Sequence, residues 1–68
     1  MGNKNIPLNA FLKIKGVVDT GGQAKIVIRS GEVFVNSEKE TRVTKKLKPG
    51  DVVKIEDYEF KVTEDIIE

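Results

Sequence analysis

Apolar residues in the first half of the chain follow the spacing of two short helices. Leu8, Phe11 and Leu12 stand at positions i, i+3 and i+4, as on one face of a helix, and Gly16 follows as its stop. The same spacing returns in a second set of apolar residues, which consists of Ala24, Val27 and Ile28. The pattern predicts two helices that pack on each other through these faces.

Both ends of the second helix carry the expected signals. Thr20 followed three positions later by Gln23 matches a capping box, in which each side chain accepts a hydrogen bond from the backbone N–H of the other residue. Gly31 stands where a helix commonly ends on glycine. We therefore expect the second helix to begin after Thr20 and to end before Gly31.

Beyond Gly31 the apolar pattern changes from helical to alternating. Val33 and Val35 would share one face of a strand, and Asn36-Ser37 is a weaker version of the Asn-Gly turn of a β-hairpin. Residues 41–43 are the expected return strand. The pattern predicts a hairpin directly after the second helix.

Two more strands are expected after a turn in the last third of the chain. Pro49-Gly50 supplies the central residues of a type II turn, because proline presets φ and glycine accepts a positive φ. Residues 52–56 and 58–62 then read as two strands joined near Asp57. We predict an α+β fold, with two packed helices followed by a small, mostly antiparallel sheet of three to five short strands.

Length and composition limit the possible functions. The 68 residues suffice for one small domain, which we expect to span residues 6–62 with frayed ends at 1–5 and 63–68. The sequence has no Cys and no His, which removes disulfides, thiol nucleophiles and the commonest metal ligands. It contains no recognisable nucleophile–base pair, metal-ligand cluster or P-loop, so we expect no enzyme activity, no cofactor and no metal. No apolar run approaches the roughly 18 residues of a membrane span, which indicates a cytoplasmic protein without a membrane partner.

The net charge of +1 conceals a strong asymmetry along the chain. Residues 1–48 hold ten Lys and Arg against four acids, whereas residues 49–68 hold two Lys against seven acids. Such segregation predicts a basic face for an anionic partner. The alternative is that folding interleaves the two segments in space. We favour the basic face because several of the cations share a helix or a loop.

The start of the second helix is a candidate phosphate site. Gly21-Gly22 would let a phosphate oxygen approach the first free N–H groups of the helix. Lys25 and Arg29 follow at four-residue spacing and would add positive charge on the same row. The alternative is that the glycines serve a tight bend and close packing between the helices, and the sequence leaves both interpretations open.

The densest positive charge lies in the segment before the Pro-Gly turn. This segment holds Arg42, Lys45, Lys46 and Lys48. Phosphate contacts from even a few such residues produce salt-sensitive binding of nucleic acid. The alternative is a solvated loop that aids solubility, and the upstream Glu38 and Glu40 would neutralise part of the charge.

These motifs, taken in order, resemble the S4 RNA-binding domain. The matching segments are Leu8-x-x-Phe11-Leu12-Lys13, Gly22-Gln23-Ala24-Lys25, Gly31-Glu32-Val33-x-Val35-Asn36 and Lys48-Pro49-Gly50-Asp51-Val52-Val53. They occur in the order and spacing of that family and cover roughly residues 6–62. The run from Thr20 to Lys25 is most similar to the small stand-alone bacterial S4 proteins, the YaaA/YbcJ-like group.

The resemblance implies an αL-like fold and binding of structured RNA, with ribosomal and transfer RNA as candidate partners. It places the RNA-binding surface at the start and exposed side of the second helix and at the basic stretch before the Pro-Gly turn. The residues at those positions are Gly21, Gly22, Gln23, Lys25, Arg29, Arg42, Lys45 and Lys46. The small bacterial group usually continues with Arg-Arg-Gly-Arg-Lys, whereas Arg42 of this chain is followed by Val43 and Thr44.

Two functional hypotheses follow from the sequence. The first is a non-enzymatic RNA-binding module that recognises structured RNA through phosphate and shape contacts on a basic face. The alternative is a protein–protein interaction domain with the same fold and no direct RNA role, using exposed Phe34, Tyr58 or Ile26. A contiguous apolar surface favours the protein partner, and a contiguous basic surface favours RNA.

Overall fold

The computed structural model describes residues 5–66, and the outermost residues of both ends that we expect to fray lie outside this range. In chain order the elements are β1 (Ile6–Pro7), α1 (Leu8–Ile14), α2 (Gly21–Arg29), β2 (Val33–Val35), β3 (Glu38–Lys39), β4 (Lys46–Leu47), β5 (Val52–Ile55), β6 (Tyr58–Lys61) and a 3-10 helix, η1 (Glu64–Ile66). The two helices precede a small antiparallel sheet, which confirms the predicted α+β fold. Strand β1, which lies before the helices, is not part of the predicted order.

Helix α1 is short because the backbone is non-helical just before its first residue and again at Gly16. Before its first residue, Pro7 has extended backbone angles, with φ −64° and ψ 146°. After its last turn, Gly16 has a φ of +76°, a conformation in which glycine ends a helix. Leu8, Phe11 and Leu12 are fully buried, as their spacing predicts. The helix therefore contributes one complete face to the core.

The capping box at the start of α2 is formed, with one partner changed. The Gln23 N–H donates to Thr20 Oγ1 at 3.1 Å, as predicted. Gln23 Oε1, however, accepts from the Asp19 N–H at 2.7 Å and not from that of Thr20. The side chain of Gln23 thus bonds the backbone of Asp19, one residue before the partner that the capping-box pattern predicts.

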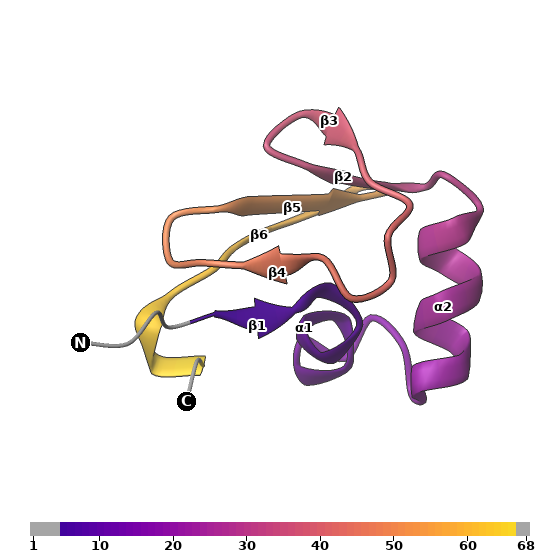
Figure 1. The fold of residues 1–68 in the computed structure, drawn as a ribbon, viewed down its shortest axis with the longest axis horizontal. Helices are drawn as coiled ribbons and strands as arrows, with labels where there is room; N and C mark the ends of the chain where they lie inside the picture. Colours follow the sequence, from indigo (N-terminus) through magenta and orange to yellow (C-terminus); the bar gives the residue numbers. More distant parts are fainter. Residues whose placement is uncertain (1–4, 67–68) are drawn as a thin grey trace.

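The inner face of α2 packs on α1. Ala24 and Ile28 are fully buried, and Val27 packs against the same core while partly exposed. Gly31 follows with a φ of +86° and ends the helix as predicted. Figure 1 shows α2 at one end of the molecule with α1 beside it. Within residues 5–66, neither of these helices nor η1 is long and apolar enough to cross a membrane.

Four strands form an antiparallel sheet in the order β3-β2-β5-β6. Its inner face consists of Val33, Val35, Val53 and Ile55, which are buried. One core cluster joins these residues to the apolar faces of both helices. Strands β5 and β6 match the predicted ranges but are each one residue shorter.

The return strand of the first hairpin is displaced from its predicted position. Residues 41–43 are not a strand, and Glu38–Lys39 forms β3 instead, with Val35 opposite Glu38. The cause is the turn itself. Asn36 and Ser37 have φ values of 53° and 72°, so two residues reverse the chain and pairing resumes at once. The predicted turn is confirmed, and the predicted return strand is wrong.

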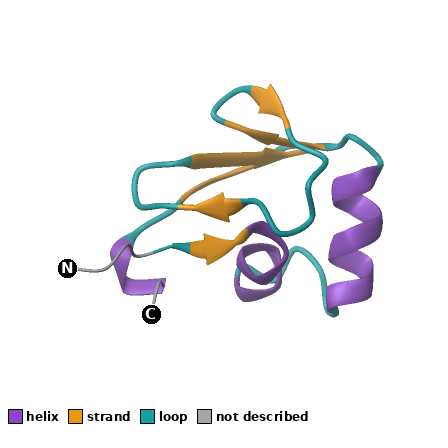
Figure 2. Ribbon diagram, in the orientation of Figure 1, coloured by secondary structure: helices purple, strands orange, loops and turns teal. Residues whose placement is uncertain are grey.

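The basic segment before the Pro-Gly turn contains a strand and is not only a loop. Strand β4 pairs antiparallel with β1, with Ile6 opposite Leu47 and Pro7 opposite Lys46. Leu47 is fully buried, so the segment is anchored in the core. Figure 2 shows this strand pair below the larger sheet and next to α1.

Candidate nucleic-acid interface

Four cations gather around one polar hollow beside β4, and we call them the cationic cluster. They are Arg42, Lys45, Lys46 and Lys48. The hollow has a volume of about 180 Å³, and its other lining residues are Val35, Asn36, Glu38, Glu40 and Asp51. A second depression, of about 400 Å³, is lined by Thr44 and three of the same cations. The structure thus brings together all four cations of the basic segment predicted before the Pro-Gly turn.

Hydrogen bonds to the backbone hold the cationic cluster in place at three points. The Lys45 carbonyl oxygen accepts from the Leu8 N–H at 2.8 Å, which ties it to the start of α1. Lys46 lies in β4 and is held by the pairing with β1. The Lys48 N–H donates to Asp51 Oδ2 at 3.0 Å. Flexible lysine side chains therefore extend from a fixed backbone.

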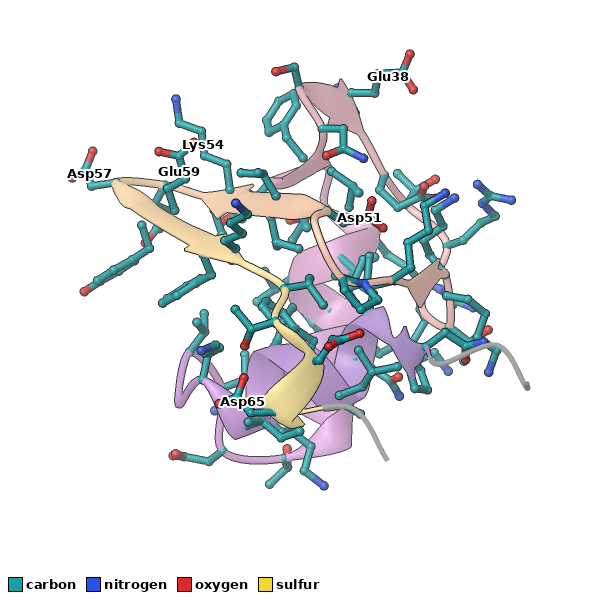
Figure 3. All side chains as sticks on the ribbon, turned by 90° about the vertical axis from the view of Figure 1, so that its left-hand side faces the viewer. Glu38, Asp51, Lys54, Asp57, Glu59 and Asp65 are labelled. Carbon is teal, nitrogen blue, oxygen red and sulfur yellow. The ribbon has the colours of Figure 1, made fainter. Side chains whose placement is uncertain are left out.

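Asp51 joins the first hairpin turn to the Pro-Gly turn beside the hollow. It is only 9% exposed, and its Oδ1 accepts from Asn36 Nδ2 at 3.2 Å. Asn36 Oδ1 in turn accepts from the Val52 N–H at 3.0 Å. Because Oδ2 accepts from the Lys48 N–H, each carboxylate oxygen has a donor, as the burial of a charge requires. Figure 3 shows Asp51 near the centre of the view, with Glu38 and Asp57 at its outer edges.

Arg42 is held by Glu40, two residues earlier in the chain. The distances are 2.9 Å from Arg42 Nε to Glu40 Oε2 and 3.3 Å from Nη2 to Oε1. The Arg42 backbone N–H also donates to Oε2, at 3.0 Å. The hydrogen bond from the Arg42 side chain holds the pKa of Glu40 below its ordinary value of 4.5, although burial acts in the opposite direction. The same hydrogen bond raises the pKa of Arg42 above its ordinary value.

Only one of the two acids expected to offset the cations makes an ion pair. Glu40 does so with Arg42, whereas the Glu38 side chain makes no ion pair or hydrogen bond with any described residue. Both acids line the cationic hollow. The cluster therefore keeps its three lysines free of salt bridges within residues 5–66.

The start of α2 presents the second group of predicted contacts. A Cβ at Gly21 would meet no atom within 4 Å, and one at Gly22 would meet only Thr20 Oγ1, at 3.8 Å. Neither glycine has a left-handed φ. Close packing between the helices therefore does not explain the glycine pair. Lys25 and Arg29 are exposed further along the helix.

The two predicted groups do not share a hollow. No residue of α2 lines either depression around the cationic cluster. Gln23 of the predicted set is occupied in the helix cap, since its Oε1 accepts from the Asp19 N–H. Figure 1 shows α2 at one end of the molecule and β4 nearer its middle. The structure thus offers two separate basic regions.

Acidic side chains concentrate on the β5–β6 hairpin. Glu56, Asp57 and Glu59 are exposed there, with Lys54 among them. Figure 3 shows Asp57, Glu59 and Lys54 together on this hairpin, apart from Asp51. In the described part of the chain, no three Asp or Glu side chains form a group that could hold a metal ion. The charge segregation seen along the sequence therefore persists in this hairpin after folding.

Comparison with known proteins places this arrangement in a family. Residues 1–63 match the family model of the S4 domain. This chain belongs to the S4 domain family. The probable ribosome maturation protein RlbA of Bacillus subtilis (strain 168) is 45% identical over 53 residues, which are 78% of this chain and 75% of that relative. The resemblance to small bacterial S4 proteins is thereby confirmed, and membership of the family supports a general role in RNA binding.

Two residues that shape the cationic cluster are absent from the predicted contacts. Glu40 holds Arg42, and Asp51 holds the backbone of Lys48. Lys48 itself belongs to the basic segment predicted before the Pro-Gly turn. The roles of the two carboxylates depend on distances that only the folded chain supplies.

Proposed function

We propose that this S4 domain binds folded ribosomal RNA through backbone phosphates at the cationic cluster. The observation that carries the proposal is the convergence of Arg42, Lys45, Lys46 and Lys48 on one hollow from an anchored backbone. Such an arrangement suits the phosphates of a folded RNA, because their positions are themselves fixed. Binding displaces counterions from the RNA, so affinity should fall steeply with salt.

The similarity to RlbA is the reason for proposing ribosomal RNA among the possible RNA partners. RlbA of Bacillus subtilis is named a probable ribosome maturation protein. We accordingly propose ribosomal RNA as the partner of this chain, and a contribution to ribosome maturation as its role. Binding alone suffices for such a role, and we propose no catalytic step.

The exposed start of α2 is proposed as a second contact with the same RNA. Gly21 and Gly22 leave room for close approach of a phosphate to the helix backbone. Lys25 and Arg29 add charge along the exposed side of the helix. Two separate basic regions would together favour a folded RNA over a short single strand, since both must be reached at once.

The alternative hypothesis of a protein-binding surface has weaker structural support. Ile26 and Tyr58 are 70% and 57% exposed, but they lie on α2 and β6. Phe34 lies on β2 and is half-buried. No described depression is lined by any two of these three residues. The cations, in contrast, share one hollow.

The test is a double substitution in the cationic cluster. Lys45→Gln with Lys46→Gln removes two charges without adding acids that would repel RNA from any position. We expect weaker binding to purified bacterial ribosomal RNA and a salt-dependence slope smaller by about two phosphate contacts. Binding is measured by filter retention over a series of salt concentrations.

A matched control uses two lysines outside the cluster. Lys54→Gln with Lys61→Gln makes the same change in net charge on the β5–β6 hairpin. We expect this variant to keep the slope of the unaltered protein. If both double variants lose affinity equally, general charge and not the cationic cluster governs binding, and the proposed site is wrong. Thermal melting verifies that both variants fold.

A further inference from the structure

The Glu40–Arg42 pair combines a sheltered acid with an exposed base. The Glu40 side chain is 12% exposed, whereas that of Arg42 is 71% exposed. An ion pair between flexible surface side chains contributes little by itself. This pair differs because Glu40 Oε2 also accepts the Arg42 backbone N–H, at 3.0 Å. The acid is therefore tied to the loop as well as to the guanidinium.

A further hydrogen bond ties Glu40 to the sheet. Its backbone N–H donates to the carbonyl oxygen of Val33 in β2, at 2.9 Å. The chain of contacts thus runs from a buried strand residue through Glu40 to the guanidinium of Arg42. An arginine held in this way loses little further freedom when it binds a ligand.

The hydrogen bonds to Glu40 occupy one edge of the Arg42 guanidinium, and no other described residue bonds its outer edge. Arginine has five N–H donors, and Glu40 engages those on Nε and one on Nη2. Both donors on Nη1 and the second on Nη2 make no hydrogen bond to any of residues 5–66. Two parallel donors on that edge match two oxygens of one phosphate, which is the bidentate geometry that arginine supplies and lysine does not.

We propose that Glu40 is a positioning residue that orients Arg42 for bidentate contact with an RNA phosphate. The inference rests on the proposed function and refines it. Arg42 supplies a contact of defined geometry, and the three lysines supply charge. Glu40 is then required for tight binding, although it places a negative charge in a surface that binds a polyanion.

A purely Coulombic role for Glu40 makes the opposite prediction. If Glu40 only neutralised the cluster or competed with phosphate for Arg42, its removal would tighten RNA binding. If it positions Arg42, its removal weakens binding despite the gain of one positive charge. The sign of the effect therefore separates the two roles.

The test compares Glu40→Gln with Glu38→Gln as a matched control. Both substitutions remove one acid that lines the cationic hollow, but the Glu38 side chain makes no bond to any described residue. With purified bacterial ribosomal RNA as the probe, we expect E40Q to bind about two- to tenfold more weakly, from the cost of immobilising a freed arginine. E38Q should bind more tightly than the unaltered protein, because it removes a negative charge beside the cations and leaves Arg42 held by Glu40.

A second arm places E40Q in an R42K background. Lysine keeps the positive charge but lacks the planar guanidinium that Glu40 would orient. E40Q should therefore no longer weaken RNA binding in the R42K background. NMR of the Arg42 Nε–H group supplies a readout without RNA, since the group should be ordered in the unaltered protein and mobile in E40Q. If E40Q unfolds, R42K alone remains a test, because it must bind more weakly than the unaltered protein.

The outcomes separate this inference from the proposed function. Equal or tighter binding by E40Q, or full binding by R42K, would overturn the positioning role while leaving the cationic cluster as the site. Failure of the unaltered protein to bind ribosomal RNA would overturn the proposed function and this inference with it. Weakening by both E40Q and E38Q would show a structural effect of the loop and would also overturn the positioning role.

Discussion

Two carboxylates organise the cationic cluster at the scale of single residues. Asp51 holds the backbone of Lys48, and Glu40 holds the side chain of Arg42. Each reduces the net positive charge of a surface that we propose to bind RNA. Each also replaces water around a backbone N–H group with a fixed acceptor, which keeps the nearby cations in place. The two carboxylates therefore fix the positions of neighbouring cations but lower the net positive charge of the surface.

Asp51→Asn tests this arrangement through stability. The amide offers one acceptor oxygen where the carboxylate has two, so either Asn36 Nδ2 or the Lys48 N–H would face another donor. We expect the free energy of unfolding to fall by about 1–3 kcal/mol. Urea unfolding gives the value.

The control for this substitution is Asp57→Asn on the exposed β5–β6 hairpin. We expect its effect to stay within about 0.5 kcal/mol. Equal stability of the two variants would contradict a structural role for Asp51.

At the scale of elements, the start of α2 combines a strong cap with two glycines that packing does not require. Thr20 caps the helix through the Gln23 N–H, and both glycines have room for a side chain. Alanine would favour the helix at these positions more than glycine does. We therefore propose that the glycines serve to expose the helix backbone to a ligand.

Gly22→Ala separates folding from binding in this element. We expect stability to rise by up to about 1 kcal/mol, because alanine restricts the unfolded chain and meets only Thr20 Oγ1. Affinity for ribosomal RNA should fall if a phosphate approaches this backbone. Thermal melting and filter retention measure the two effects.

Gly31→Ala provides the contrasting control, because the φ of +86° at Gly31 disfavours any side chain. This variant should lose stability. Unchanged RNA affinity in Gly22→Ala would show that the start of α2 is not a contact.

At the scale of the whole molecule, the charges are distributed over distinct regions. The cationic cluster lies in the segment that leads through β4, and the exposed acids lie on the β5–β6 hairpin. In the binding mode that we propose, the acidic hairpin would repel RNA while the cationic cluster attracts it, so the charge pattern would also orient the complex.

Chemical-shift mapping tests this orientation. On addition of a ribosomal RNA fragment, the largest amide shifts should occur at Arg42, Lys45 and Lys46, and at the start of α2. The hairpin tip at Glu56 and Asp57 should change little. Shifts at the tip that match those of the cluster would contradict the proposed face.

Local signals in the sequence sufficed for the helices and turns. The apolar spacing of Leu8 and Phe11, the cap at Thr20 and the glycine stops all act over four residues or fewer, and the structure confirms them. The predicted strand at residues 41–43 is wrong because the two-residue turn at Asn36-Ser37 lets pairing resume at Glu38, three residues earlier. The domain limits of 6–62 stay a prediction.

The sequence by itself determined the α+β order, the family and the main cations. These features follow from the local spacing of residues and from the order of the motifs, and neither depends on contacts between distant parts of the chain. Only the tertiary structure decided how those cations are held. The pairing of Ile6 with Leu47, and the link of Asn36 to Asp51, join residues far apart in the chain. Glu40 and Arg42 are near neighbours, yet their pairing needs a loop whose path is set by β2 and α1. Such contacts depend on the whole folded chain, so no local pattern contains them.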